Sequence, residues 1–244
     1  MNWQIRWVAK PLVFVACLLP ALQLAAGAFG VAGVSLGADP VKHILHATGT
    51  WALRLLAATL LVTPLKELTG SLTWLRFRRM LGLYAFFYAV LHFSTYVFLD
   101  QDGKLSAILK DIVKHPYVLL GFLGLLLLIP LAATSTAKAQ RRLGRRWTRL
   151  QQLVYVVAGL GVWHYWWLVK KDIRPPLAYA AVFAILIGYR WVRHRRLKRR
   201  SDRGSAPGSA PHGLQGPVEL EQQGLGGVPA DTRVRDRYPE FERS

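Results

Sequence analysis

Two histidines stand inside long apolar stretches of the chain, His92 in FYAVLHFSTY and His164 in GLGVWHYWW. Ligating or ionisable side chains are costly inside a membrane and usually have a functional reason to be there. Neutral imidazole is a common axial ligand of haem iron, and two are needed to ligate both faces. Aromatic residues that suit a porphyrin surround both: Tyr88, Phe93, Tyr96, Trp163, Tyr165, Trp166 and Trp167. The pattern indicates a b-type haem with His92 and His164 as axial iron ligands.

The predicted depths of the two histidines also match. His92 stands eight residues before Asp100 and His164 six before Lys170, in apolar segments that both run outward. At about 1.5 Å per residue, they lie ~12 and ~9 Å below the outer ends of their helices. Imidazoles at similar depth on neighbouring helices can reach one iron. The alternative is that each histidine only hydrogen-bonds a neighbouring helix, with the aromatic residues marking the membrane interface.

His46 and Arg54 stand in HATGTWALRLL, where another apolar segment begins. His46 is near the outer surface, which favours an interfacial residue, with an alternate haem ligand as the second interpretation. Arg54 lies ~12 Å deeper by helical rise. Its guanidinium either extends back to the surface or pairs with a haem propionate at the outer level.

Membrane helices must position these residues. Six apolar segments of the 244 residues approach the ~20 residues that cross a bilayer; they are 11–31, 46–64, 80–99, 117–134, 149–169 and 176–192. None alternates polar and apolar residues as a transmembrane barrel does. The sequence therefore predicts an all-α integral membrane protein with a six-transmembrane-helix bundle. No internal repeat is strong enough to subdivide it.

The basic residues predict the topology. Alternate connections, beginning with the N-terminus, hold 20 Lys and Arg, and the connections between them hold 7. The positive-inside rule then places both termini in the cytoplasm of a bacterial cell with the chain in its inner membrane. The net charge of +19 flanks apolar segments, so it indicates a lipid bilayer and no nucleic acid. The clusters at 76–82 and 138–150 either anchor the bundle to anionic lipid or receive a flavin phosphate or an acidic reductase.

Composition divides the chain into a bundle over 1–196 and a tail over 197–244. The tail is rich in Gly, Pro, Ser and charge, which predicts a disordered cytoplasmic segment. The single cysteine, Cys17, excludes an intrachain disulfide or an iron–sulfur site. No GxGxxG motif opens a nicotinamide-binding unit, so electrons must come from another molecule.

Three stretches resemble the MsrQ (YedZ) family within the ferric-reductase-like transmembrane superfamily: RRMLGLYAFFYAVLHFSTYVFLDQ, LAATSTAKAQRRLGRRWTRLQQLVY and HATGTWALRLLAATLLVTPL. The resemblance covers about residues 10–190. It implies a six-helix bundle with b-type haem bound by His92 and His164, and association with FMN. It also implies electron delivery to MsrP, the periplasmic molybdopterin subunit that reduces protein methionine sulfoxide.

Family members often have a histidine where this chain has Gln151. Gln151 is thirteen residues before His164, so an ideal helix separates them by ~140° and ~20 Å. We therefore expect one haem and no inner one. The predicted function is an electron relay from a cytoplasmic flavin reductase or a quinol, within an oxidoreductase system but without the sulfoxide-reducing site. The rivals are a ferric or oxygen reductase, a proton-coupled transporter without haem, and a structural anchor.

Overall fold

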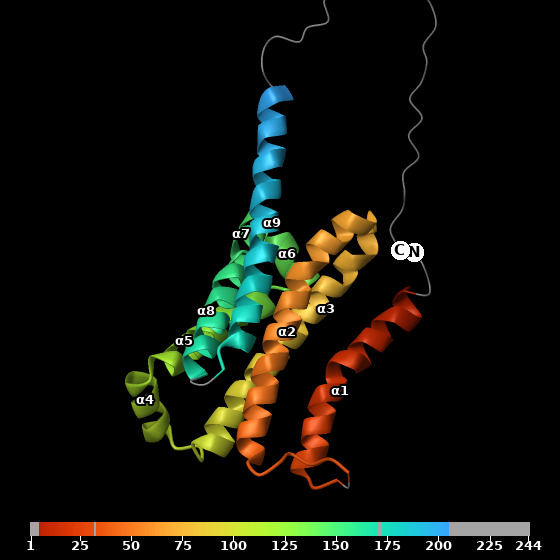
Figure 1. Cartoon of the computed structure of the whole chain (residues 1–244). Coiled ribbons are helices and arrows are strands. Elements are labelled where there is room, and N and C mark those ends of the chain that lie inside the picture. Colours follow the sequence, from red (N-terminus) through yellow and green to blue (C-terminus); the bar gives the residue numbers. More distant parts are fainter. Residues whose placement is uncertain (1–4, 32, 170–171, 205–244) are drawn as a thin grey trace, which may run out of the picture. The chain divides into compact units, whose positions relative to one another are not determined.

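The computed structural model describes residues 5–31, 33–169 and 172–204, and within these ranges it is helical with short connections and no strand (Figure 1). In chain order the elements are η1 Ile5–Ala9, α1 Lys10–Ala28, α2 Pro40–Thr69, η2 Leu72–Trp74, α3 Leu75–Thr95, η3 Tyr96–Asp100, α4 Leu105–Lys114, α5 Pro116–Ala133, α6 Ala137–Leu143, α7 Arg145–Gln151, α8 Leu153–Leu168 and α9 Arg174–Gly204. The described residues as far as Ser201 form one compact unit. The all-helical prediction is confirmed for the described residues.

Five helical segments in the described residues are long and apolar enough to cross a membrane. They are Trp7–Ala28, Pro40–Thr69, Leu72–Asp100, Pro116–Ala133 and Arg174–Leu197. The remaining predicted segment, 149–169, contains the end of α7 and the 16 residues of α8, with Gln152 between the two helices. The chain is thus a multi-pass membrane protein, and the sixth span and the orientation stay predictions.

The boundary between bundle and tail at residues 196 and 197 stays a prediction. Helix α9 continues past residue 196 to Gly204. The rest of the predicted tail, 205–244, lies outside the described residues.

Two helix pairs carry most of the packing: α2 lies against α3, and α5 lies against α8 (Figure 1). The core side chains come from these helices and from α1 and α9: Cys17, Leu55, Leu56, Leu60, Tyr84, Ala85, Tyr88, Leu128, Leu131, Val154, Val157, Ala158, Phe183 and Leu186. Many other large apolar side chains are exposed, among them Leu12, Leu123, Leu126, Ile129 and Ile185. A lipid-facing surface explains this exposure, since helices in a bilayer associate by close packing rather than by leaving water.

Helix α1 is joined to α3 through tyrosine hydroxyls. Tyr88 donates to the carbonyl of Cys17 at 2.8 Å and accepts from the amide of Ala21 at 3.0 Å. An undistorted helix would join that carbonyl and that amide directly. The hydroxyl is therefore inserted into the backbone ladder of α1, next to Pro20. Tyr84 adds a second bond from its hydroxyl to a carbonyl of α1.

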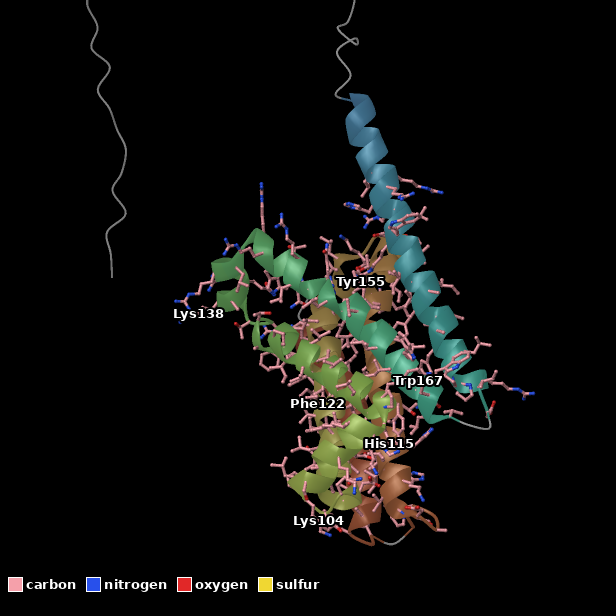
Figure 2. All side chains as sticks on the ribbon, turned by 90° about the vertical axis from the view of Figure 1, so that its left-hand side faces the viewer. Lys104, His115, Phe122, Lys138, Tyr155 and Trp167 are labelled. Atoms are coloured by element: carbon pink, nitrogen blue, oxygen red, sulfur yellow. The ribbon has the colours of Figure 1, made fainter. Side chains whose placement is uncertain are left out.

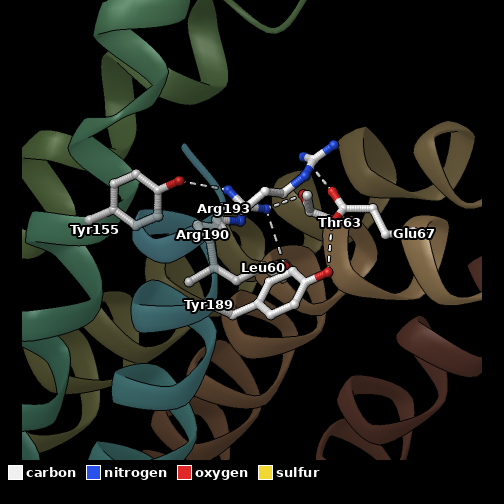
Figure 3. Close-up of polar contacts among 7 residues, drawn as sticks. All are labelled: Leu60, Thr63, Glu67, Tyr155, Tyr189, Arg190 and Arg193. Atoms are coloured by element: carbon white, nitrogen blue, oxygen red, sulfur yellow. Dashed lines mark hydrogen bonds and ion pairs between the residues drawn. The ribbon is translucent and has the colours of Figure 1, made fainter. Parts of the chain in front are cut away.

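Arg190 of α9 repairs a gap in α2. Pro64 has no amide hydrogen for the carbonyl of Leu60, and Nη2 of Arg190 donates to that carbonyl at 3.2 Å (Figure 3). Nη2 also donates to Oγ1 of Thr63, and Nη1 donates to the hydroxyl of Tyr155 at 2.7 Å. One guanidinium thus joins α9 to α2 and α8, and satisfies a carbonyl that lipid could not.

Two lysines lie far apart in the described unit. Figure 2 shows Lys104 at the bottom of the view and Lys138 higher up, at its left edge. They belong to the connections that the charge pattern assigned to opposite sides of the membrane.

Candidate cofactor site

The imidazoles of His92 and His164 face one another between α3 and α8. Their ring centres are 6.1 Å apart and their planes are nearly perpendicular, at 85°. Both side chains are half-buried. The two histidines selected from the sequence therefore lie together, although 72 positions of the chain separate them.

Each imidazole is oriented by a backbone carbonyl of the helix it packs on. Nδ1 of His92 donates to the carbonyl of Leu45 in α2 at 2.9 Å, and Nδ1 of His164 donates to the carbonyl of Tyr117 in α5 at 2.6 Å. A carbonyl only accepts, so Nδ1 carries the hydrogen in both rings and Nε2 keeps its lone pair. Bonds of this kind fix the tautomer and direction of metal-binding histidines.

Each imidazole also lies over a glycine one helical turn beyond its carbonyl. A Cβ placed on Gly49 would lie 3.1 Å from Nδ1 and Cε1 of His92. A Cβ on Gly121 would lie 3.0 Å from the same atoms of His164. In both cases 47 positions separate the histidine from the carbonyl that it bonds. The hairpins α2–α3 and α5–α8 thus contain the same local arrangement, a repeat that the sequence analysis missed.

This arrangement fits one shared haem iron. A metal–nitrogen bond of about 2 Å places the centres of two imidazoles on one metal about 6 Å apart, as observed here. In the described residues, no group of three or more His, Cys, Asp or Glu side chains could hold a metal ion. Two histidines suit an iron whose other four ligands belong to a macrocycle.

A chain of contacts through Tyr165 and Tyr179 links His46 to Arg54. Nε2 of His46 is 3.5 Å from the hydroxyl of Tyr165, and the ring of Tyr165 contacts that of Tyr179 at 6.1 Å. Nε of Arg54 donates to the hydroxyl of Tyr179 at 3.3 Å, and its guanidinium stacks on Trp51. His46 is exposed, in keeping with an interfacial residue.

Gln151 forms a helix-end contact. Its amide nitrogen donates to the carbonyl of Leu131 at 3.2 Å, in the last turn of α5. The indole nitrogen of Trp147 donates to the carbonyl of Thr134, the residue that follows α5, at 3.0 Å. Gln151 thus helps to cap α5, because the last carbonyls of a helix have no partner within it.

Asp111 braces the connection between η3 and α5. One of its carboxylate oxygens accepts from the hydroxyl of Tyr96 at 2.7 Å, and the other from Nδ1 of His115 at 2.6 Å. His115 directly precedes α5. The brace therefore fixes the start of the helix whose Tyr117 carbonyl orients His164.

Helix α9 contributes a further ionic contact with α2 that the sequence did not single out. Arg193 pairs with Glu67 of α2, and the hydroxyl of Tyr189 donates to the other carboxylate oxygen at 2.5 Å (Figure 3). Nε of Arg190 is buried without a hydrogen-bond partner among the described residues. In the sequence, Arg190 contributed only to the count of basic residues that predicts the topology. Its bond to α2 could have been suspected from Pro64, because a proline leaves one carbonyl of its helix without a partner.

The chain is similar in sequence to several known proteins. A family model described as "Ferric reductase like transmembrane component" matches residues 48–162. Several relatives carry the name "Protein-methionine-sulfoxide reductase heme-binding subunit MsrQ". The relative from Xanthomonas campestris pv. campestris (strain 8004) is 53% identical over 173 residues, which are 71% of this chain and 79% of the relative. That from Xanthomonas oryzae pv. oryzae (strain MAFF 311018) is 48% identical over 206 residues, 83% of this chain and 94% of the relative. That from Polaromonas naphthalenivorans (strain CJ2) is 41% identical over 211 residues, 85% and 95%.

Proposed function

Since the chain belongs to the MsrQ family of haem-binding membrane subunits, we propose that it binds one b-type haem and relays electrons across the membrane. The observation that carries this proposal is the facing pair His92 and His164, with Nδ1 of each bonded to a carbonyl and Nε2 of each left for iron. The resemblance found in the sequence analysis is confirmed by the relatives, and it supports the same function.

Residues of the chain position the haem and set its redox potential. When bound, the haem supplies reversible one-electron chemistry at its iron. His92 and His164 would hold the iron, and the carbonyls of Leu45 and Tyr117 raise the basicity of the two imidazoles by accepting their Nδ1 hydrogens. The surrounding apolar helices limit the access of water, which also sets the potential.

Arg54 is proposed to support a haem propionate at the outer level. Its Nε is bonded to Tyr179, which leaves the two terminal nitrogens of the guanidinium for an anion. Arginine suits a carboxylate because its planar fork can donate two parallel hydrogen bonds. The competing role, a guanidinium that only reaches toward the surface, is tested below.

The partners follow from the family. The electron acceptor is MsrP, the periplasmic molybdopterin subunit that reduces methionine sulfoxide in proteins. The donor is a cytoplasmic flavin reductase or a membrane quinol. FMN, expected from the resemblance alone, stays a prediction.

The relay requires a defined orientation, with six spans and both termini in the cytoplasm. The charge bias of 20 to 7 supports it. Reporter fusions after Gly103 and after Gly208 should give periplasmic and cytoplasmic signals, respectively. Signals from the same side would contradict this topology.

An absorption spectrum of the purified protein, with haem quantitation, tests the proposal directly. We expect a Soret band, low-spin features that sharpen on reduction, and one haem per chain. Absence of haem from protein expressed with sufficient haem would favour a transporter without cofactor. Electron transfer to iron salts or oxygen, without transfer to MsrP, would favour a ferric or oxygen reductase.

A further inference from the structure

Two glycines, one in each hairpin, occupy equivalent places beneath the candidate iron ligands. Gly49 lies four positions after Leu45, and Gly121 lies four positions after Tyr117. One helical turn therefore presents a carbonyl to Nδ1 and then a bare backbone to the ring edge. The same combination on two separate helix pairs indicates a requirement of the histidines.

We propose that Gly49 and Gly121 are positioning residues that set the direction of the two imidazoles toward a common iron. The proposal rests on the proposed function, because it assumes that His92 and His164 are the ligands. It assigns to the glycines a role that helix packing alone would not require.

Each imidazole ring would be held at both ends. Nδ1 is fixed by the carbonyl, at 2.9 Å for His92 and 2.6 Å for His164, and Nε2 would be fixed by the iron. A Cβ at 3.0–3.1 Å from Nδ1 and Cε1 is closer than nine in ten real Cβ contacts, so the ring would have to move by a few tenths of an ångström. The ring could make room only by lengthening the Nδ1 bond or by turning Nε2 away from the iron.

Two other glycines of these hairpins lack this closeness, whereas a Cβ on Gly161 of α8 would meet the side chain of Leu53 at 3.0 Å. A Cβ on Gly124, one turn after Gly121 in α5, would meet its nearest neighbour at 3.9 Å. A Cβ on Gly82 in α3 would meet Thr59 at 3.7 Å. Both are ordinary van der Waals distances, so alanine fits at these two positions.

The two sites differ in one detail. The hydroxyl of Thr48, a buried side chain, lies 3.5 Å from Nδ1 of His92, whereas position 120, the equivalent one in α5, is a leucine. Thr48 limits the movement of His92 on one side. We therefore expect His92 to accommodate an added methyl group no better than His164 does.

The experiment compares Gly49→Ala and Gly121→Ala with the matched controls Gly82→Ala and Gly124→Ala in the full-length protein. The readouts are haem per chain, the electron paramagnetic resonance of the ferric iron, and the midpoint potential. The two test variants should retain haem about tenfold less tightly, as is typical when the partners of a metal-binding histidine are disturbed. Their remaining low-spin signal should shift, and the controls should match the parent protein. Test variants that equal the controls in all three readouts would overturn the proposal.

A double-mutant cycle covers the case in which an alanine variant folds poorly. The thermal stability of the haem-free protein is compared between His92→Ala and His92→Ala/Gly49→Ala, and likewise between His164→Ala and His164→Ala/Gly121→Ala. With the ring removed, the added methyl group should no longer destabilise the protein. A cost that persists without the ring would show that the glycine serves helix packing, and the proposal would be wrong. Failure of the proposed function looks different, because the single histidine variants would then keep a native low-spin spectrum.

Discussion

The two hairpins carry matching side chains near the end that is predicted to be outer, and different side chains near the end that is predicted to be inner. Thirteen residues before His92 and His164 stand Arg79 and Gln151. At the outer end, both hairpins present an imidazole with the same carbonyl contact. At the inner end, Arg79 is exposed, while Gln151 is half-buried and bonds Leu131. A two-ligand iron site needs matching residues from both hairpins, and only the outer end supplies them.

The largest effect should follow from removing either outer ligand. His92→Ala or His164→Ala opens one axial position of the iron, so each should abolish or strongly disturb the low-spin spectrum. The measurement is the absorption and paramagnetic resonance of purified protein with haem quantitation. If both variants kept a native low-spin spectrum at full haem loading, the ligands would lie elsewhere, and His46 would be the first residue to test.

Replacing Arg190, near the other end of the bundle, should lower the stability of the protein without affecting haem binding. Arg190→Met should leave the haem spectrum intact but destabilise the bundle by about 2–3 kcal/mol, since the buried carbonyl of Leu60 would lose its partner. Thermal unfolding in detergent measures this cost. The control is Arg195→Met on the same helix, where an exposed guanidinium stacks on Trp191. Equal losses in the two variants would mean that the contacts of Arg190 carry no special weight.

Arg54→Leu sharpens the comparison at the outer level. If the guanidinium pairs with a propionate, haem should be retained up to roughly fivefold less tightly, as for a partly exposed ion pair, and its midpoint potential should shift. Arg54→Lys keeps the positive charge, so its haem affinity should lie between that of the parent protein and that of Arg54→Leu. Unchanged haem affinity and potential in Arg54→Leu would favour a guanidinium that only reaches for the surface.

The smallest effect should come from Gln151. Gln151→Ala removes one hydrogen bond at the end of α5 and should cost about 1 kcal/mol, with one haem still bound. Gln151→His should not create a second site, because Arg79 occupies the equivalent position of the other hairpin. Two haems per chain in Gln151→His would show that one inner histidine suffices, and the comparison between the ends would fail.

The parts of the molecule that the sequence predicted depend on local properties. Five helices of spanning length follow from apolar runs, and the histidines were found because ligating residues are rare at such depth. The matched depths of His92 and His164 also followed from counting residues along helices. The two imidazoles do lie close together, with ring centres 6.1 Å apart, which is in keeping with those matched depths.

What the sequence did not reveal depends on contacts between distant residues. Glycine is permitted at many helix positions, so Gly49 and Gly121 gain meaning only from imidazoles that belong to other helices. Arg190 resembled any basic residue near a span end, and its bond to Leu60 joins positions 130 apart. The break between α7 and α8 at Gln152 was also missed, since that stretch reads as continuously helical.

The hydroxyl of Tyr88 in the backbone of α1 has a consequence for biogenesis. The ribosome makes α1 before α3, so Cys17 and Ala21 enter the membrane before the tyrosine that later bridges them exists. In that interval the two backbone groups must bond each other or water, because lipid offers them no partner. The first helix therefore changes its own hydrogen bonding when α3 arrives, and the order of synthesis becomes part of how the bundle closes.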